Sequence, residues 1–73
     1  MKLPPAGGKR TVEALLRAGF LVHRVRGGHY ILKHIQTGRR VTVPYHRQEL
    51  APKTLDSILK QAGISRERFV KLL

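Results

Sequence analysis

Histidine is the residue of this 73-residue sequence best suited to proton transfer near neutral pH, and the chain carries four histidines. Imidazole has an ordinary pKa of about 6.5, as a general acid or base at neutral pH requires. His29 directly follows the pair Gly27 and Gly28, opens a run of strand-forming residues and has cations on both sides. A neutral imidazole ring can accept a proton. His29 is therefore the candidate catalytic base, and a polar residue at a hairpin edge is the alternative.

The charge of the chain indicates which substrate such a base would meet. Fifteen lysines and arginines face four acidic residues, for a formal net charge of +11, and no acidic residue lies between Glu13 and Glu49. The positive electrostatic field of such a chain attracts polyanions, and in most proteins of this kind the lysines and arginines bind phosphate groups. RNA brings its own nucleophile, the 2′-hydroxyl, so one base and several cations would suffice for cleavage without a metal ion. The candidate phosphate-binding residues are Arg24, Arg26 and Lys33, with Arg39 and Arg40 extending the basic surface.

The other histidines give no metal-site pattern, because no two of them stand at i, i+4 on an expected helix and no carboxylate accompanies them. No metal ion or other cofactor is expected. His46 follows Pro44 and Tyr45 in a basic loop and is a candidate RNA contact, with a loop-capping role as the alternative. His34, at the end of an expected strand, is predicted to be a surface residue.

Several protein classes are excluded by composition. The sequence has no cysteine, which excludes disulfides and thiol chemistry. Its longest apolar run is far shorter than the roughly 18 residues of a membrane span. The first residues contain no apolar segment typical of a secretory signal, so a cytoplasmic protein with no membrane association is expected.

Hydrophobic spacing and turn residues predict the elements that position His29. Apolar residues at i, i+3 and i+4 predict a helix over 9–18 that ends before Gly19, and a second apolar stripe predicts a helix over 52–62 closed by Gly63. Strand-forming runs predict strands over 20–26, 29–34 and 39–43, separated by turns and ended by Pro44. Ser65 is expected to cap a short last helix. Residues 1–8 are predicted to form a flexible arm and residues 9–73 a single domain.

This order predicts an α+β fold: a two-layer α-β-β-β-α arrangement with a short extra C-terminal helix. Val41 and Val43 should face the helices. If Tyr30 and Leu32 also point inward, His29, Ile31 and Lys33 share the open face. Leu21, Val25 and Ile31 would then form an apolar patch beside His29 that awaits a protein partner. The alternative is that these three residues belong to the core and the strand is turned the other way.

Three stretches of the chain resemble the HicA family of toxin–antitoxin systems, over nearly its whole length. They read LLRAGFLVHRVRGGHYILKH, TGRRVTVPYH and ELAPKTLDSILKQAGIS. In the family, a helix ends at Gly-aromatic and a strand leads to Gly-Ser-His. An Arg-x-Val-Thr-Val-Pro strand and a Thr-Leu-x-x-Ile-Leu helix follow. Each motif is weak alone, but their order and spacing together are specific.

The resemblance implies a fold similar to the double-stranded-RNA-binding domain. It also implies a metal-independent endoribonuclease, an mRNA interferase that cleaves mRNA and is neutralised by a HicB-type antitoxin. The family's catalytic histidine corresponds to His29, and its Pro-x-His corresponds to Pro44 through His46. The family's Gly-Ser corresponds to Gly27 and Gly28, which are therefore counted among the RNA-binding positions, although the serine hydroxyl is missing here.

Two functions thus remain: an endoribonuclease toxin, or a non-catalytic RNA-binding module of the double-stranded-RNA type. Both use the same fold and the same charge, so neither property distinguishes them. His29 does, because an enzyme needs it, whereas a module that reads RNA shape needs mainly lysine and arginine. A DNA-binding regulator has no support, since neither long helix carries the side chains of a recognition helix.

Overall fold

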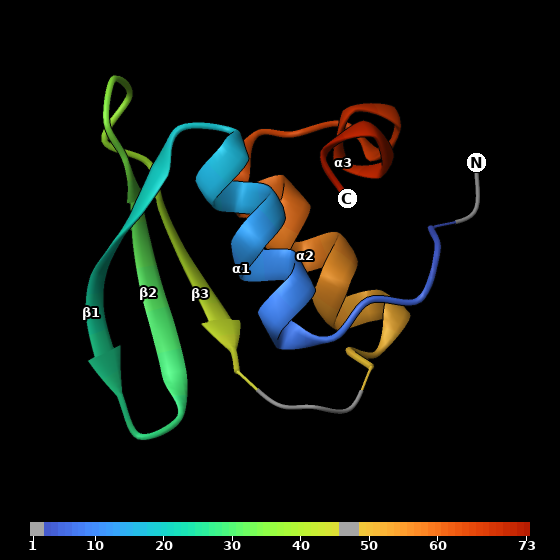
Figure 1. Ribbon diagram of the computed structural model, residues 1–73, viewed down its shortest axis with the longest axis horizontal. Coiled ribbons are helices and arrows are strands. Elements are labelled where there is room, and N and C mark those ends of the chain that lie inside the picture. The colour runs from blue at the N-terminus through green and yellow to red at the C-terminus, as the bar shows by residue number, and fades with distance from the viewer. Residues whose placement is uncertain (1–2, 46–48) are drawn as a thin grey trace.

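Helices and strands follow one another in the predicted order (Figure 1). The computed structural model describes residues 3–45 and 49–73. The elements are α1 (Gly8–Arg17), β1 (Phe20–Arg26), β2 (His29–His34), β3 (Arg40–Pro44), α2 (Pro52–Ala62) and α3 (Arg66–Leu72). The strands form one antiparallel sheet in the order β1-β2-β3. The predicted α+β fold, α-β-β-β-α with an extra C-terminal helix, is confirmed.

The core lies between the sheet and the helices. In Figure 1 the helices all lie on one side of the sheet; α1 packs against β1 and β3, α2 packs against β3, and α3 contacts α1. Val41 and Val43 are buried, as predicted from their alternation with exposed residues. The largest fully buried side chains are Phe20, Phe69, Leu15, Leu32 and Ile58.

The helix ends follow from their capping residues. Gly63 ends α2 with φ +70°, in the left-handed region where a glycine meets no steric penalty. The Ser65 hydroxyl accepts a hydrogen bond from the backbone N–H of Arg68 at 3.2 Å, so the predicted cap of α3 is confirmed. Ile64 and Phe69, which flank this cap, are both buried, as in a hydrophobic staple.

Part of the segment predicted as a flexible arm lies against the core. Ala6 is buried, and its carbonyl accepts a hydrogen bond from the N–H of Leu50 at 2.9 Å. Gly7 forms a single antiparallel bridge with Glu49. Residues 6–7 are therefore joined to the chain just before α2.

His34 is half-buried, so its prediction as a surface residue is wrong. Its Nδ1 accepts hydrogen bonds from the N–H groups of Gln36 (3.1 Å) and Thr37 (3.2 Å). An acceptor at Nδ1 places the proton on Nε2, which donates to the Ala18 carbonyl at 3.1 Å. The ring also meets Phe20 edge-on, with centroids 4.9 Å apart. The sheet places the α1–β1 turn beside the end of β2. His34 therefore joins the α1–β1 turn to the turn that follows β2.

Gly19→Ala is expected to destabilise the fold. Gly19 has φ +101°, and a Cβ there would lie 2.9 Å from Nε2 of His34. The backbone term alone costs about 1–2 kcal/mol, and displacement of His34 adds to it. Urea denaturation measures the loss. Gly27→Ala is the control, because Gly27 also has positive φ but no atom lies within 4 Å of its Cβ position. Equal losses in the two variants would contradict a role for the His34 contact.

Candidate functional site

His29 stands at the start of β2, directly after a two-residue turn. Gly27 and Gly28 have φ of +55° and +79°, the combination that a tight hairpin turn with the twist of a sheet requires. His29 is exposed and pairs with Arg26 on one side and Pro44 on the other. Its Nδ1 lies 3.3 Å from the Gly27 carbonyl, and Nε2 has no partner among the described residues. The second ring nitrogen is thus available for a substrate.

A β-bulge at His23 decides which side chains share the face of His29. Val22 pairs with Leu32, but the next pair is Arg24 with Ile31, so His23 is an extra residue in β1. Directly opposed residues in an antiparallel pair project on the same face. The bulge therefore turns Arg24 and Arg26 to the face of His29, whereas regular alternation from Phe20 would have turned both toward the helices.

The predicted direction of β2 is confirmed, because Leu32 is fully buried and Tyr30 packs against the core. Its neighbour Ile31, half-buried, therefore lies on the open face together with Lys33. Leu21, which pairs with Lys33, lies on this face as predicted.

Val25 does not lie beside His29, and this part of the sequence-based prediction is wrong. Val25 pairs with Tyr30 and so shares the face that packs toward the helices. The prediction assumed unbroken alternation along β1, which the bulge at His23 reverses. The apolar part of the open face is therefore formed by Leu21 and Ile31.

Four exposed cations share the open face of the sheet with His29. Lys33 and Arg40 are opposed across β2 and β3, while Arg24 and Arg26 follow β1. We call these four residues the basic face. No acidic residue occurs in β1, β2 or β3. An anion approaching His29 therefore meets positive charge without a compensating carboxylate in the sheet.

Arg39 differs from the other predicted cations, because it is bound to the end of α2. Its Nη1 donates to the Gln61 carbonyl at 3.4 Å, and its guanidinium lies against Gly63. A cation is favourable at a helix C-terminus. β3 begins at Arg40, after this residue, and therefore one residue later than predicted. His46, the other predicted RNA contact in this part of the sequence, lies outside the described residues.

A shallow hollow of about 320 Å³ opens beside His29, between β3 and α2. Sequence reasoning missed its α2 wall, because the prediction of this helix rested on the apolar stripe that faces the core. The sequence did contain a sign of this wall, because polar residues follow one another at helical spacing beside the apolar stripe. The lining consists of His29, Thr42, Pro44, Lys53, Thr54, Ser57, Ile58 and Gln61. We call this space the β3–α2 hollow.

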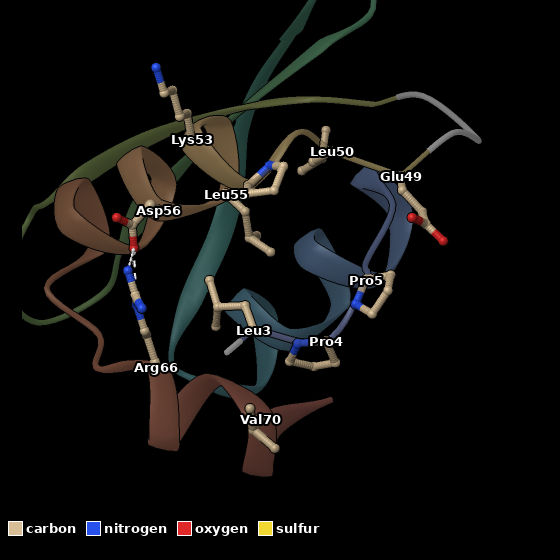
Figure 2. Close-up of a pocket in the computed structure, with 11 residues that line it drawn as sticks. Leu3, Pro4, Pro5, Glu49, Leu50, Lys53, Leu55, Asp56, Arg66 and Val70 are labelled. Atoms are coloured by element: carbon tan, nitrogen blue, oxygen red, sulfur yellow. Dashed lines mark hydrogen bonds and ion pairs between the residues drawn. The ribbon is translucent and has the colours of Figure 1, made fainter. Parts of the chain in front are cut away.

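A larger groove of about 820 Å³ lies on another part of the surface, between residues 3–5, α2 and α3 (Figure 2). Its lining is mainly aliphatic and proline side chains. Asp56 and Arg66, at one side of it, form an ion pair with 2.9 Å between Oδ1 and Nη2. The described residues that line this groove include no histidine. The β3–α2 hollow, with His29 in its wall, is therefore the candidate site for proton transfer.

Within residues 3–45 and 49–73, no three histidine, aspartate or glutamate side chains gather closely enough to hold a metal ion. In the same part of the chain, none of the helices combines the length and apolar character needed to cross a bilayer.

Comparison with known proteins identifies the family. The sequence model of the HicA toxin of bacterial toxin–antitoxin systems matches residues 8–64, from the first residue of α1 to just beyond α2. No curated protein sequence matches the chain. The family match includes the whole sheet, the glycine turn before His29 and the α2 wall of the hollow. Because it covers well over half of the sequence, the chain belongs to the HicA toxin family of bacterial toxin–antitoxin systems.

Proposed function

We propose that this toxin is a metal-independent endoribonuclease that cleaves mRNA with His29 as its general base. The observation that carries the proposal is the position of His29: exposed in the wall of a hollow and bordered by the basic face. A polyanionic substrate that carries its own nucleophile fits this combination of one proton acceptor and several cations.

The reaction is an internal transfer within the RNA strand. His29 accepts the proton of a 2′-hydroxyl, and the 2′-oxygen attacks the neighbouring phosphorus. The bond from phosphorus to the 5′-oxygen breaks, and that oxygen leaves with a proton from solvent. The products are a 2′,3′-cyclic phosphate and a 5′-hydroxyl end. The strand is cut with no external oxidant, reductant or nucleophile.

Family membership implies a protein antitoxin, and we infer that it is an acidic, HicB-type protein that covers the open face. Leu21 is 57% exposed, and half-buried Ile31 lies on the same face amid the cations. An apolar patch with a charged rim is typical of a protein interface. A partner placed there would cover His29 and neutralise the basic face together, and its charge would speed association.

Gly28 supports the second candidate, a module that binds RNA without cleaving it. The HicA pattern has a serine at this position, and the chain therefore lacks a hydroxyl beside His29. Binding by the basic face would persist without that group, whereas catalysis would lose any contribution it makes. RNA cleavage by the purified protein distinguishes the two functions.

Neutralising three cations of the basic face is expected to weaken RNA binding and its dependence on salt. The variant carries Arg24→Gln, Arg26→Gln and Lys33→Gln, and each lost phosphate contact should lower the slope of log affinity against log salt by about 0.7 on single-stranded RNA. A protein that also carries His29→Ala keeps the RNA intact during the titration. The control carries Lys9→Gln, Lys60→Gln and Lys71→Gln, which remove three exposed charges from the helices. An equal fall in slope for both triple variants would contradict binding at the sheet.

A further inference from the structure

The β3–α2 hollow has a wall with no part in the chemistry described so far. The side chain of Gln61 joins this wall to the sheet: its Oε1 accepts from the N–H of Thr42 at 3.5 Å, and its Nε2 donates to the Ser57 hydroxyl at 3.3 Å. The polar flank of α2 is thereby fixed against β3. His29 and α2 consequently face one hollow from two separate elements.

Lys53 supplies the charge of this wall. It is exposed in the first turn of α2, and among the described residues that line the hollow it is the one lysine or arginine. Lys53 also contributes to the lining of the apolar groove, and Figure 2 shows its side chain extending away from the Asp56–Arg66 ion pair. Lys53 is therefore the cation that lines the hollow together with His29.

The register of the sheet gives His29 a different environment on each side. Across β1 it meets Arg26, a member of the basic face, and across β3 it meets Pro44, which carries no charge. Beyond Pro44 the surface continues into the hollow and to Lys53. A phosphate seated in the hollow would thus have His29 on one side and an ammonium group on the other.

Cleavage of an RNA strand requires a positively charged group at the phosphate. When the 2′-oxygen attacks, the phosphorus becomes five-coordinate and negative charge accumulates on its non-bridging oxygens. His29 accepts a proton but does not neutralise that charge. A positively charged donor aimed at those oxygens stabilises the transition state more than the bound substrate. A lysine ammonium is a compact point charge with three donors and suits this role.

The size of the hollow limits what can enter it. At about 320 Å³ it is at the lower end of the roughly 300–1,000 Å³ of small-molecule sites. A space of this size suits one nucleotide, and proteins take up single nucleotides from unpaired stretches of RNA. We propose that the β3–α2 hollow binds one unpaired RNA nucleotide and that Lys53 is a second catalytic residue, which contacts the scissile phosphate and stabilises its five-coordinate transition state; this inference rests on the proposed endoribonuclease function.

The test compares Lys53→Ala with Lys60→Ala. Both lysines are exposed on α2, so the two variants lose the same charge from the same helix, but Lys60 does not line the hollow. With a short single-stranded RNA as substrate, kcat and KM are measured for each variant. Lys53→Ala should lower kcat by about 10²-fold with little change in KM. Lys60→Ala should leave kcat unchanged, and Lys53→Arg, which keeps a charged donor, should recover most of the lost activity.

Three results would overturn the inference. If wild type cleaves RNA and Lys53→Ala matches Lys60→Ala, the role of Lys53 is wrong while the endoribonuclease function stands. A change in KM alone would make Lys53 a ground-state contact and not a catalytic residue. If wild type cleaves no RNA, the endoribonuclease function itself is wrong, and the role of Lys53 is lost with it. Circular dichroism of each variant checks that loss of activity does not reflect loss of fold.

Discussion

His29→Ala should abolish RNA cleavage and the growth arrest that it causes, with the fold intact. Loss of a positioned general base typically lowers the rate by about 10²–10⁴-fold. The side chain is exposed, and its one hydrogen-bond contact, to the Gly27 carbonyl, is long at 3.3 Å. Its removal should therefore change the free energy of unfolding by less than about 0.5 kcal/mol. Single-turnover cleavage of RNA by purified protein measures the first quantity and urea denaturation the second.

The control for this experiment is His23→Ala. His23 is also an exposed histidine of the sheet, but it occupies the bulge in β1 and does not line the β3–α2 hollow. It should retain wild-type cleavage. Cleavage at the wild-type rate by His29→Ala, with contaminating nuclease excluded, would show that His29 is not the base. Tight RNA binding by a wild-type protein that cuts nothing would favour the non-catalytic RNA-binding module.

Ile31→Asp should release the toxin from its antitoxin. Ile31 is half-buried at the centre of the open face, between Arg24 on β1 and Thr42 on β3. A carboxylate there removes an apolar contact and repels an acidic partner. Loss of an interface hot spot costs at least about 2 kcal/mol, or roughly 30-fold in affinity. Titration of antitoxin against the variant measures the affinity, and growth in the presence of antitoxin measures the release.

A pair of further variants separates an interface role of Ile31 from a structural one. Leu32→Asp should unfold the protein, because Leu32 is fully buried and an unpaired carboxylate cannot be accommodated there. Leu21→Asp should stay folded and weaken antitoxin binding, since Leu21 is exposed on the same face. If Ile31→Asp fails to fold, or if Leu21→Asp and Ile31→Asp both bind antitoxin normally, the open face is not the interface.

The sequence was sufficient for the elements of this fold, because their ends are marked by residues with strong local preferences. Gly19, the pair Gly27 and Gly28, and Gly63 all adopt positive φ at element ends, as their type and position predicted. The bounds of β1, β2 and α2 agree with the prediction residue for residue. These signals are local, so they can be read without knowledge of the tertiary structure.

The arrangement of the site depended on contacts that no local signal carries. The bulge at His23 leaves no mark in residue type, yet it determines that Arg24 and Arg26 share the face of His29 and that Val25 does not. The β3–α2 hollow exists only because α2 packs beside β3, although the two segments are separated in the sequence. The predictions that failed were those that needed register or packing between elements.

The bulge in β1 also bears on how the protein avoids aggregation. β1 is an edge strand of the sheet, and with Leu21, Val22 and Val25 exposed it could recruit the same strand of another copy. The extra residue His23 interrupts the regular ladder of backbone hydrogen bonds that such pairing requires. It also turns Arg24 and Arg26 to one face, so that two copies of β1 would bring like charges together. The same extra residue that gathers cations around His29 therefore favours solubility at the exposed edge of the sheet.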